Sequence, residues 1–210
     1  MKDFTRLQTV LKEHPMLPVA LGIVWNLAYA VFNATLGISR SSWWFITLAV
    51  FYALLGLMRL SVVTIGKNGR WKETSVMRMN GAAIASLSIV FTGITILTIR
   101  QQQNPVRNHI VMIAIAAFTF AFVVLSIRDI IRAHRERSAL LITLRNIDCV
   151  TAAGAVLSLE REMLGTFGNA ADSLTVTAEA VSGAIAFLLM IGLGIGLILH
   201  SREFEKKQQT

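Results

Sequence analysis

The sequence predicts an all-α membrane protein: six helices that each cross a bilayer, packed as one bundle in a single domain, with both termini in the cytoplasm. Three observations predict this fold. Of the 210 residues, 54% are hydrophobic and 15% are charged, whereas a soluble domain usually has about 25% charged residues. Six apolar stretches approach the length of about 20 residues that crosses a bilayer. Lysine and arginine gather in alternate connecting segments, as in multi-pass membrane proteins.

The segment before the first span, residues 2–14, has apolar residues at helical spacing among basic ones. This pattern predicts a short amphipathic helix that lies on the cytoplasmic leaflet. Pro15 and Pro18 follow it, and proline ends a helix. A frayed basic tail is the alternative interpretation of the same residues.

Six apolar stretches make up the predicted spans, with ends placed to within a few residues. They are Pro18–Ile38, Trp43–Val63, Gly81–Ile99, Ile110–Ile127, Ala139–Leu159 and Ala180–Leu199. Trp43 and Trp44 open the second span at the outer interface, where indole rings prefer to lie. The fifth span contains charged residues, so an alternative with five spans leaves it on the membrane surface.

The orientation of the spans follows from the distribution of lysine and arginine. Of the 20 such residues, 15 lie at the two ends of the chain and around the links after the second and fourth spans, four lie in or beside the other links, and Arg145 lies inside the fifth span. An excess of positive charge marks the cytoplasmic segments of a membrane protein. We therefore expect a multi-pass protein of a bacterial-type cytoplasmic membrane, with the N-terminus and the C-terminus inside.

Polar residues on the first two spans predict a site inside the bundle. Asn26 and Asn33 share a face of the first span, and their amides need partners within the bilayer. They either hydrogen-bond to neighbouring helices or line a polar cavity. Tyr52 and Arg59 share a face of the second span. Arg59 is expected to lean back into the membrane, because side chains point toward the N-terminus of their own helix.

The fifth span carries Arg145, Asn146 and Asp148. At about 1.5 Å per residue, Asp148 lies roughly 14 Å from the cytoplasmic end, near the midplane of a ~30 Å hydrocarbon core. Arg145 is long enough to reach the surface, and Asn146 can bond to a neighbouring helix. Asp148 is short and needs a cation, a proton or water. Arg145 and, across the bundle, Arg59 are its predicted partners, in a structural ion pair or in an ion-coupled site.

Small residues at helical spacing predict close contacts between spans. The face of the third span consists of Gly81, Ala85, Ser88, Thr92 and Thr95. In the sixth span, Gly192 and Gly196 form a GxxxG pair, which we expect to pack against another helix.

Charged residues outside the spans are predicted to lie at the membrane surface or in solvent. A run of arginines after the fourth span is predicted to contact anionic lipids on the cytoplasmic face; it comprises Arg128, Arg132, Arg135 and Arg137. An acidic external loop is predicted to be solvated, with attraction of cations as the alternative; it comprises Glu160, Glu162, Asp172 and Glu179, with Arg161.

Several kinds of function are excluded or not expected. The net charge of +8 does not indicate nucleic-acid binding, because the basic residues lie in short blocks between apolar runs and do not form one patch. Cys149 is the only cysteine, so an intrachain disulfide is excluded. The four histidines lie far apart, and no nucleophile or phosphate-loop motif is present. We expect no metal, no cofactor and no enzymatic activity.

Two stretches carry a resemblance to other proteins: "WNLAYAVFNATLGISRSSWWFITLAVFYALLGLMR" and "LRNIDCVTAAGAVLSLEREML". With them, the chain resembles small six-span proteins of bacterial cytoplasmic membranes over most of its length. This resemblance implies the fold and brings no function with it.

The size, six spans and cytoplasmic termini also resemble the substrate-binding S-components of energy-coupling-factor vitamin transporters. Those proteins carry an AxxxA pattern in the first span, and Ala30 and Ala34 have this spacing. The long re-entrant first loop of several S-components is missing here, since about four residues join the first two spans.

Two hypotheses for function remain. The first is a small transporter or permeation protein whose polar site lies inside the bundle. The second is a non-transporting membrane component that binds lipid or a partner membrane protein, including an S-component-like subunit, or that forms a homo-oligomer. The polar residues would form the site in the first case and would hold the helices together in the second.

Overall fold

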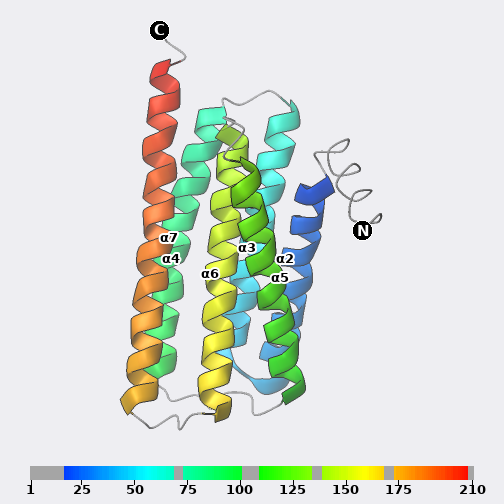
Figure 1. Ribbon diagram of the computed structural model, residues 1–210, viewed down its shortest axis with the longest axis vertical. Helices are drawn as coiled ribbons and strands as arrows, with labels where there is room; N and C mark the ends of the chain where they lie inside the picture. Colours follow the sequence, from blue (N-terminus) through cyan, green and yellow to red (C-terminus); the bar gives the residue numbers. More distant parts are fainter. Residues whose placement is uncertain (1–16, 69–72, 101–108, 134–138, 168–172, 208–210) are drawn as a thin grey trace.

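The computed structural model describes residues 17–68, 73–100, 109–133, 139–167 and 173–207. In this part of the chain the regular elements are six α-helices: α2 (Leu17–Arg40), α3 (Trp43–Asn68), α4 (Glu73–Arg100), α5 (His109–Ala133), α6 (Ala139–Phe167) and α7 (Ser173–Lys207). The helices stand side by side, and each runs antiparallel to the next along the chain (Figure 1). The predicted amphipathic segment 2–14 lies outside the described residues.

The bundle has a Leu17 end and an Arg40 end, where α2 begins and ends. The Leu17 end also holds the end of α7, and the Arg40 end holds the short link to α3 (Figure 1). Helices α2, α4 and α6 run from the Leu17 end to the Arg40 end, while α3, α5 and α7 run back. In the predicted topology, the Leu17 end faces the cytoplasm.

Five of the described helices are long and apolar enough to cross a membrane: α2, α3, α4, α6 and α7. The apolar stretch of α5 is shorter, Met112–Val124. The all-α fold and the membrane-embedded character of the chain are therefore confirmed, while the sixth span and the location of the termini stay predictions. Helix α6 packs against α3, α4, α5 and α7, so the alternative in which it lies apart on the membrane surface is wrong.

Large apolar side chains cover the outside of the bundle. Ile38, Ile110 and Phe120 are 77%, 77% and 72% exposed. Meanwhile Asn26, Asn33 and many other polar residues are buried. Lipid accepts an apolar surface, and polar groups in a membrane protein turn toward the bundle interior. The distribution of side chains thus agrees with a lipid-facing exterior.

Three helices extend well beyond the predicted spans. Helix α6 continues to Phe167, α4 begins at Glu73, and α7 begins at Ser173. The stretch 157–164 of α6, LSLEREML, holds no helix breaker and is rich in strong helix formers. Arg161 and Glu162 therefore lie inside a helix, and both are buried. The prediction that these two residues belong to a solvated external loop was wrong.

A tight turn joins α2 to α3. Ser41 has a left-handed backbone, with φ of 50°. The amide of Ser42 donates to the carbonyl of Gly37 at 3.0 Å, and the amide of Ser41 donates to that of Ile38 at 3.4 Å. This pair of bonds is the Schellman motif, which caps the last carbonyls of a helix. The two helices leave the turn in close contact, since a Cβ on Gly37 would lie 2.9 Å from the backbone nitrogen of Ile46.

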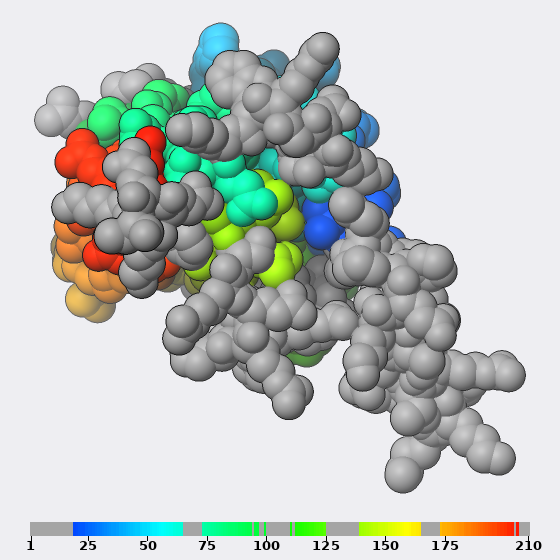
Figure 2. All heavy atoms as spheres, turned by 90° about the horizontal axis from the view of Figure 1, so that it is seen from above, coloured from blue at the N-terminus to red at the C-terminus, as the bar shows by residue number. Residues whose placement is uncertain are grey.

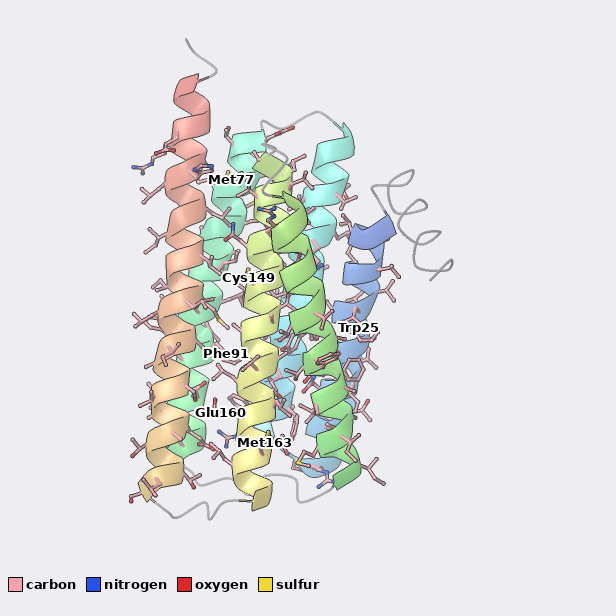
Figure 3. All side chains as sticks on the ribbon, in the orientation of Figure 1. Trp25, Met77, Phe91, Cys149, Glu160 and Met163 are labelled. Atoms are coloured by element: carbon pink, nitrogen blue, oxygen red, sulfur yellow. The ribbon has the colours of Figure 1, made fainter. Side chains whose placement is uncertain are left out.

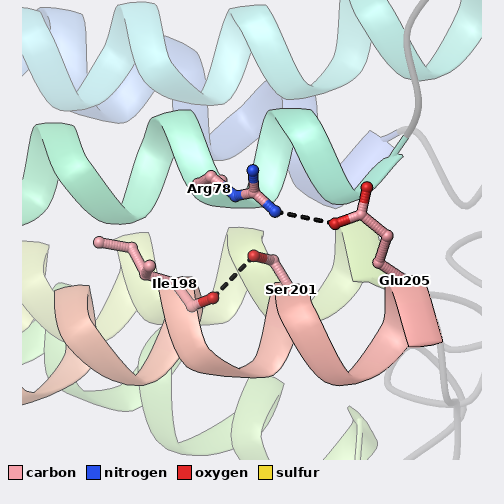
Figure 4. Close-up of polar contacts among 4 residues, drawn as sticks. All are labelled: Arg78, Ile198, Ser201 and Glu205. Atoms are coloured by element: carbon pink, nitrogen blue, oxygen red, sulfur yellow. Dashed lines mark hydrogen bonds and ion pairs between the residues drawn. The ribbon is translucent and has the colours of Figure 1, made fainter.

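Helices α4 and α7 form a second close pair, on the side of the bundle away from α2 (Figures 1 and 2). A Cβ on Gly81 would lie 2.7 Å from the carbonyl oxygen of Gly194, and a Cβ on Gly194 would lie 2.9 Å from the amide nitrogen of Ala85. The predicted packing face of the third span is thereby confirmed at Gly81 and Ala85. At the Leu17 end, Arg78 donates to Glu205 at 2.9 Å (Figure 4).

The contact surface of α7 differs from the predicted one. A Cβ on Gly192 or on Gly196 would meet no atom within 4 Å of the described chain. Gly194, between them, makes the contact with α4. The sequence showed three glycines at every second position, and helical spacing alone does not decide whether the face of Gly192 and Gly196 or that of Gly194 turns inward.

Candidate functional site

An ion pair between α3 and α6 is the first feature of the site. Arg59 of α3 contacts the Asp148 carboxylate of α6 through Nη2, and their side chains are 8% and 13% exposed. The contact that the sequence predicted across the bundle is therefore confirmed. In low dielectric such a pair compensates two charges that are costly to bury alone.

Gly22 of α2 makes room for this ion pair. A Cβ built on Gly22 would overlap Nη1 of Arg59 and would lie 3.1 Å from its Cζ. The guanidinium is thus held between α2 on one side and Asp148 on the other. Three helices meet at this point, about one third of the way from the Leu17 end.

The other two polar residues of the predicted "RNID" cluster lie differently. Asn146 donates from Nδ2 to the carbonyl of Ile142 at 2.9 Å, within its own helix. This bond replaces the expected bond to a neighbouring helix. Arg145 is partly buried, and the structure places Arg59 of α3 against Asp148.

Tyr52 connects α3 to α6 further along the bundle. Its buried hydroxyl donates to the carbonyl of Thr151 at 3.4 Å. Gly154 allows the two helices to approach, because its Cβ would lie 2.7 Å from Phe51 and 3.2 Å from the hydroxyl of Tyr52. Tyr52 also packs edge-on against Tyr29 of α2, with ring centroids 4.6 Å apart.

Asn26 lies on α2 one turn beyond Gly22, on the same helix face. It is fully buried, and its Cβ faces Gly56 of α3. Within the described part of the chain, neither atom of its amide has a hydrogen-bond partner. A buried amide without partners is costly in a bilayer.

Asn33 lies two helical turns beyond Asn26, on the same face of α2. Its Nδ2 donates to the carbonyl of Tyr29 at 2.8 Å, which fixes the rotation of the amide. Its Oδ1 is buried and has no hydrogen-bond partner among the described residues. The structure therefore presents the acceptor of Asn33 to the interior.

The site contains three residues that sequence reasoning missed: Tyr29, Ser158 and Glu162. Ser158 and Asn33 lie within hydrogen-bond reach of the hydroxyl of Tyr29, and the carboxylate of Glu162 lies within electrostatic reach of it. Each of the four side chains is no more than 1% exposed. The signal was present in the sequence, since Tyr29 and Asn33 are four residues apart on one helix and Ser158 and Glu162 are four apart on another. The predicted fifth span ended at Leu159, so Glu162 fell outside it and the pair of Ser158 and Glu162 was not recognised.

A second buried charged group, that of Arg161, lies toward the Arg40 end of the bundle. The guanidinium of Arg161 lies 4.6 Å from the ring centroid of Trp44. Its Nη1 is 3.8 Å from the carboxylate of Glu179 on α7. Glu160 and Met163 lie on the same part of α6 (Figure 3). Arg161 is thus held by an aromatic face and an acid from two other helices.

Aromatic rings fill the space between α2 and α5. Trp25 packs against Phe118 at 5.2 Å between ring centroids, and Tyr29 packs against Phe118 and Phe122 at 4.8 and 5.5 Å. These rings cover the side of the site away from α4 and α7. They keep the first half of α2 close to the bundle through side chains and hold Tyr29 in place.

The predicted lipid contacts fall only partly in the described chain. Arg128 and Arg132 belong to α5, and Arg135 and Arg137 lie outside the described residues.

Comparison of the chain with protein-family models, with curated proteins and with solved structures returned no match.

Proposed function

We propose that this membrane protein is a small transporter or permeation protein, in which a polar solute or ion passes along the face of α2 that carries Gly22, Asn26, Tyr29 and Asn33. Asn26 is the observation that carries the proposal. It is fully buried one helical turn from the Arg59–Asp148 pair, and neither of its amide atoms has a partner in the described chain.

The argument rests on the cost of such an amide in a bilayer. Each polar group left without a hydrogen bond there costs several kcal/mol, so a structural asparagine at this place would bond to a helix backbone, as Asn146 does. Water or a solute that passes Asn26 would supply the missing bonds. Polar groups inside a membrane bundle generally mark such pathways.

The Arg59–Asp148 pair supplies a gate in this proposal. While the pair is closed, each charge is satisfied by the other. A permeating ion or a proton that binds one member weakens its hold on the other and opens the contact between α3 and α6. Gly22 leaves no side chain of its own in the way of the guanidinium. A bacterial-type cytoplasmic membrane with both termini inside is part of the proposal, based on the distribution of lysine and arginine.

The experiment is a swelling assay with proteoliposomes. Vesicles with and without the purified protein are diluted into iso-osmotic glycerol, urea, glycine, sodium acetate or potassium chloride, and the light scattering is followed. We expect protein-dependent swelling in at least one of these solutes. Asn26→Leu and Asp148→Asn should reduce it, and Glu160→Gln, at a partly exposed position of α6, should leave it unchanged. Equal swelling with and without protein in every solute would contradict the proposal.

The second candidate function is a non-transporting membrane component that binds lipid or a partner membrane protein. The closed Arg59–Asp148 pair favours it, because two buried charges that satisfy each other are all that a packing role requires. In that case Asp148→Asn lowers the stability of the protein, while the vesicles that contain wild-type protein show no swelling.

A further inference from the structure

We infer that Asn26 and Arg59 form a binding site for a small neutral amide, with urea as the first candidate. The site lies at the contact between α2 and α3. As a statement of which solute takes the proposed pathway, the inference rests on the proposed function. Binding itself does not require transport, so the site and the pathway can fail separately.

The site holds polar groups that the protein leaves without partners. Asn26 is fully buried, and Arg59 is 7% exposed. The Nδ2 and Oδ1 of Asn26 and the Nε of Arg59 have no hydrogen-bond partner among the described residues. Asp148 contacts the guanidinium at Nη2, which leaves the Nε–H group to another acceptor. Two donors and one acceptor are therefore unmatched at one helix contact, which is costly in a bilayer.

Two glycines bring these groups to the same contact. The guanidinium of Arg59 lies against Gly22 of α2, and the Cβ of Asn26 lies against Gly56 of α3. Gly22 and Asn26 are one turn apart on α2, which corresponds to about 6 Å along the helix axis. A molecule of the size of urea, with a hydrogen bond on each side, spans such a distance.

The space beside Asn26 is not filled by another side chain. A Cβ built on Gly56 would lie 3.5 Å from Leu27 and 3.7 Å from the Cβ of Asn26, which is ordinary van der Waals contact. An atom of that size therefore fits next to Asn26 without displacing either neighbour. A Cβ on Gly22 would instead overlap Arg59, so the room for a ligand lies on the Gly56 side.

The pattern of donors and acceptors indicates the class of ligand. The amide of Asn26 offers N–H and C=O side by side, and such an edge forms two hydrogen bonds with an adjacent acceptor and donor. Urea and primary amides have this edge, because their N–H donates to Oδ1 while their carbonyl accepts from Nδ2. The second lone pair of the carbonyl accepts from the Nε–H of Arg59. A single water molecule has no such paired edge.

The charge of the site favours a neutral ligand. Arg59 is already paired with Asp148, and an added ion would need a further charge of opposite sign inside the bundle. A neutral amide adds hydrogen bonds and no charge. Binding therefore leaves the contact between α3 and α6 closed.

The test is saturation-transfer difference NMR on the full-length protein in detergent, with acetamide as the probe because its methyl group gives one resolved signal. We expect saturation transfer to acetamide that an excess of urea removes. Acetate, which has the same shape without the N–H group, should show none that urea removes. Asn26→Leu should raise the urea concentration for half displacement by about tenfold or more, since two hydrogen bonds are lost. Gel filtration and circular dichroism establish that each variant is folded.

Gly56→Ala keeps both polar side chains and fills the space beside Asn26, so it decides the matter if Asn26→Leu does not fold. It should weaken the displacement by urea to a similar extent. Gly93→Ala on α4, whose Cβ would meet nothing within 4 Å of the described residues, should leave it unchanged. Absence of a signal that urea removes in folded wild-type protein would overturn the inference, and so would equal displacement in Asn26→Leu. Water held at Asn26 in place of an amide would give the first of these results.

Uptake of radioactive urea by proteoliposomes separates the site from the pathway. Protein-dependent uptake that is faster than that of glycerol supports both. Displaceable binding without uptake of any solute would retain the site and contradict the proposed function. Uptake of other solutes without displaceable binding would retain the proposed function and overturn the site.

Discussion

Gly22 on α2 lies directly against the guanidinium of Arg59 on α3, at the point where Arg59 meets Asp148 on α6. Any side chain at this glycine must displace the arginine. A residue that has no side chain beyond hydrogen therefore determines where the guanidinium of the ion pair can lie.

Gly22→Ala should lower the stability of the protein. In most helices Gly→Ala is favourable by about 0.5–1 kcal/mol, but here the new methyl group overlaps Nη1 of Arg59. We expect a net loss of about 1–3 kcal/mol, the usual cost of overpacking, measured as a lower thermal midpoint in detergent. Gly93→Ala on α4 is the matched control, since its Cβ would meet nothing within 4 Å of the described residues. An effect of Gly22→Ala that persists in an Arg59→Met background would contradict this explanation.

Asp148→Asn should alter expression or stability much more than Glu160→Gln does. The first change leaves the buried Arg59 without its acid, which typically costs about 3–5 kcal/mol. The second affects a partly exposed side chain of the same helix. Thermal unfolding followed by tryptophan fluorescence measures both. Adding Arg59→Gln to Asp148→Asn should recover part of the loss, and equal, negligible effects of the two single changes would defeat the expectation.

Asn26→Leu should stabilise the protein and reduce the proposed permeation of solutes, measured as vesicle swelling. Leucine has nearly the same size and removes two buried polar atoms that have no partner among the described residues. Burial of a polar group without a hydrogen bond costs about 1–3 kcal/mol by mutational measurements, so a gain of up to this size is expected in the unfolding midpoint. Asn146→Leu is the control, because it breaks an existing bond to Ile142 and should not stabilise. A loss of stability in Asn26→Leu would mean that Asn26 is satisfied in the native membrane.

Gly194→Leu should separate α4 from α7, while Gly196→Leu should be tolerated. A leucine at position 194 would overlap backbone atoms of Gly81 and Ala85, whereas the Cβ of a leucine at position 196 would meet no atom of the described chain within 4 Å. We expect the first variant to aggregate or to be lost from the membrane fraction. A cysteine pair at Arg78 and Glu205, which contact each other at 2.9 Å, reports the separation as a loss of crosslinking.

The sequence predicted the features that depend on composition and on single positions. Apolar length placed α2, α3, α4, α6 and α7, and the direction in which a side chain leans on its helix brought Arg59 to Asp148. These arguments need only one helix at a time and the bilayer as solvent. That is why the ion pair was predicted without knowledge of how the helices are arranged.

Features that depend on helix ends or on rotation about the helix axis were missed. Hydropathy ends the fifth span at Leu159, because Glu160, Arg161 and Glu162 lower the average, although Trp44 of α3 and Glu179 of α7 hold the charge of Arg161 inside the bundle. Glu162 was consequently assigned to a loop. The choice between Gly194 and its neighbours Gly192 and Gly196 likewise depends on which face of α7 meets α4. That is a property of two helices far apart in the sequence.

The pairing of α4 with α7 has a consequence for how the protein is made. Arg78 and Glu205, which close this pair, are 127 residues apart. At a synthesis rate of about 5–20 residues per second, roughly 6–25 s pass between the emergence of the one and of the other from the ribosome. During that time the glycine-lined face of α4 has no helix to receive it. The nascent chain therefore carries an incomplete bundle until α7 has been translated, because α7 is the helix that packs against this face of α4.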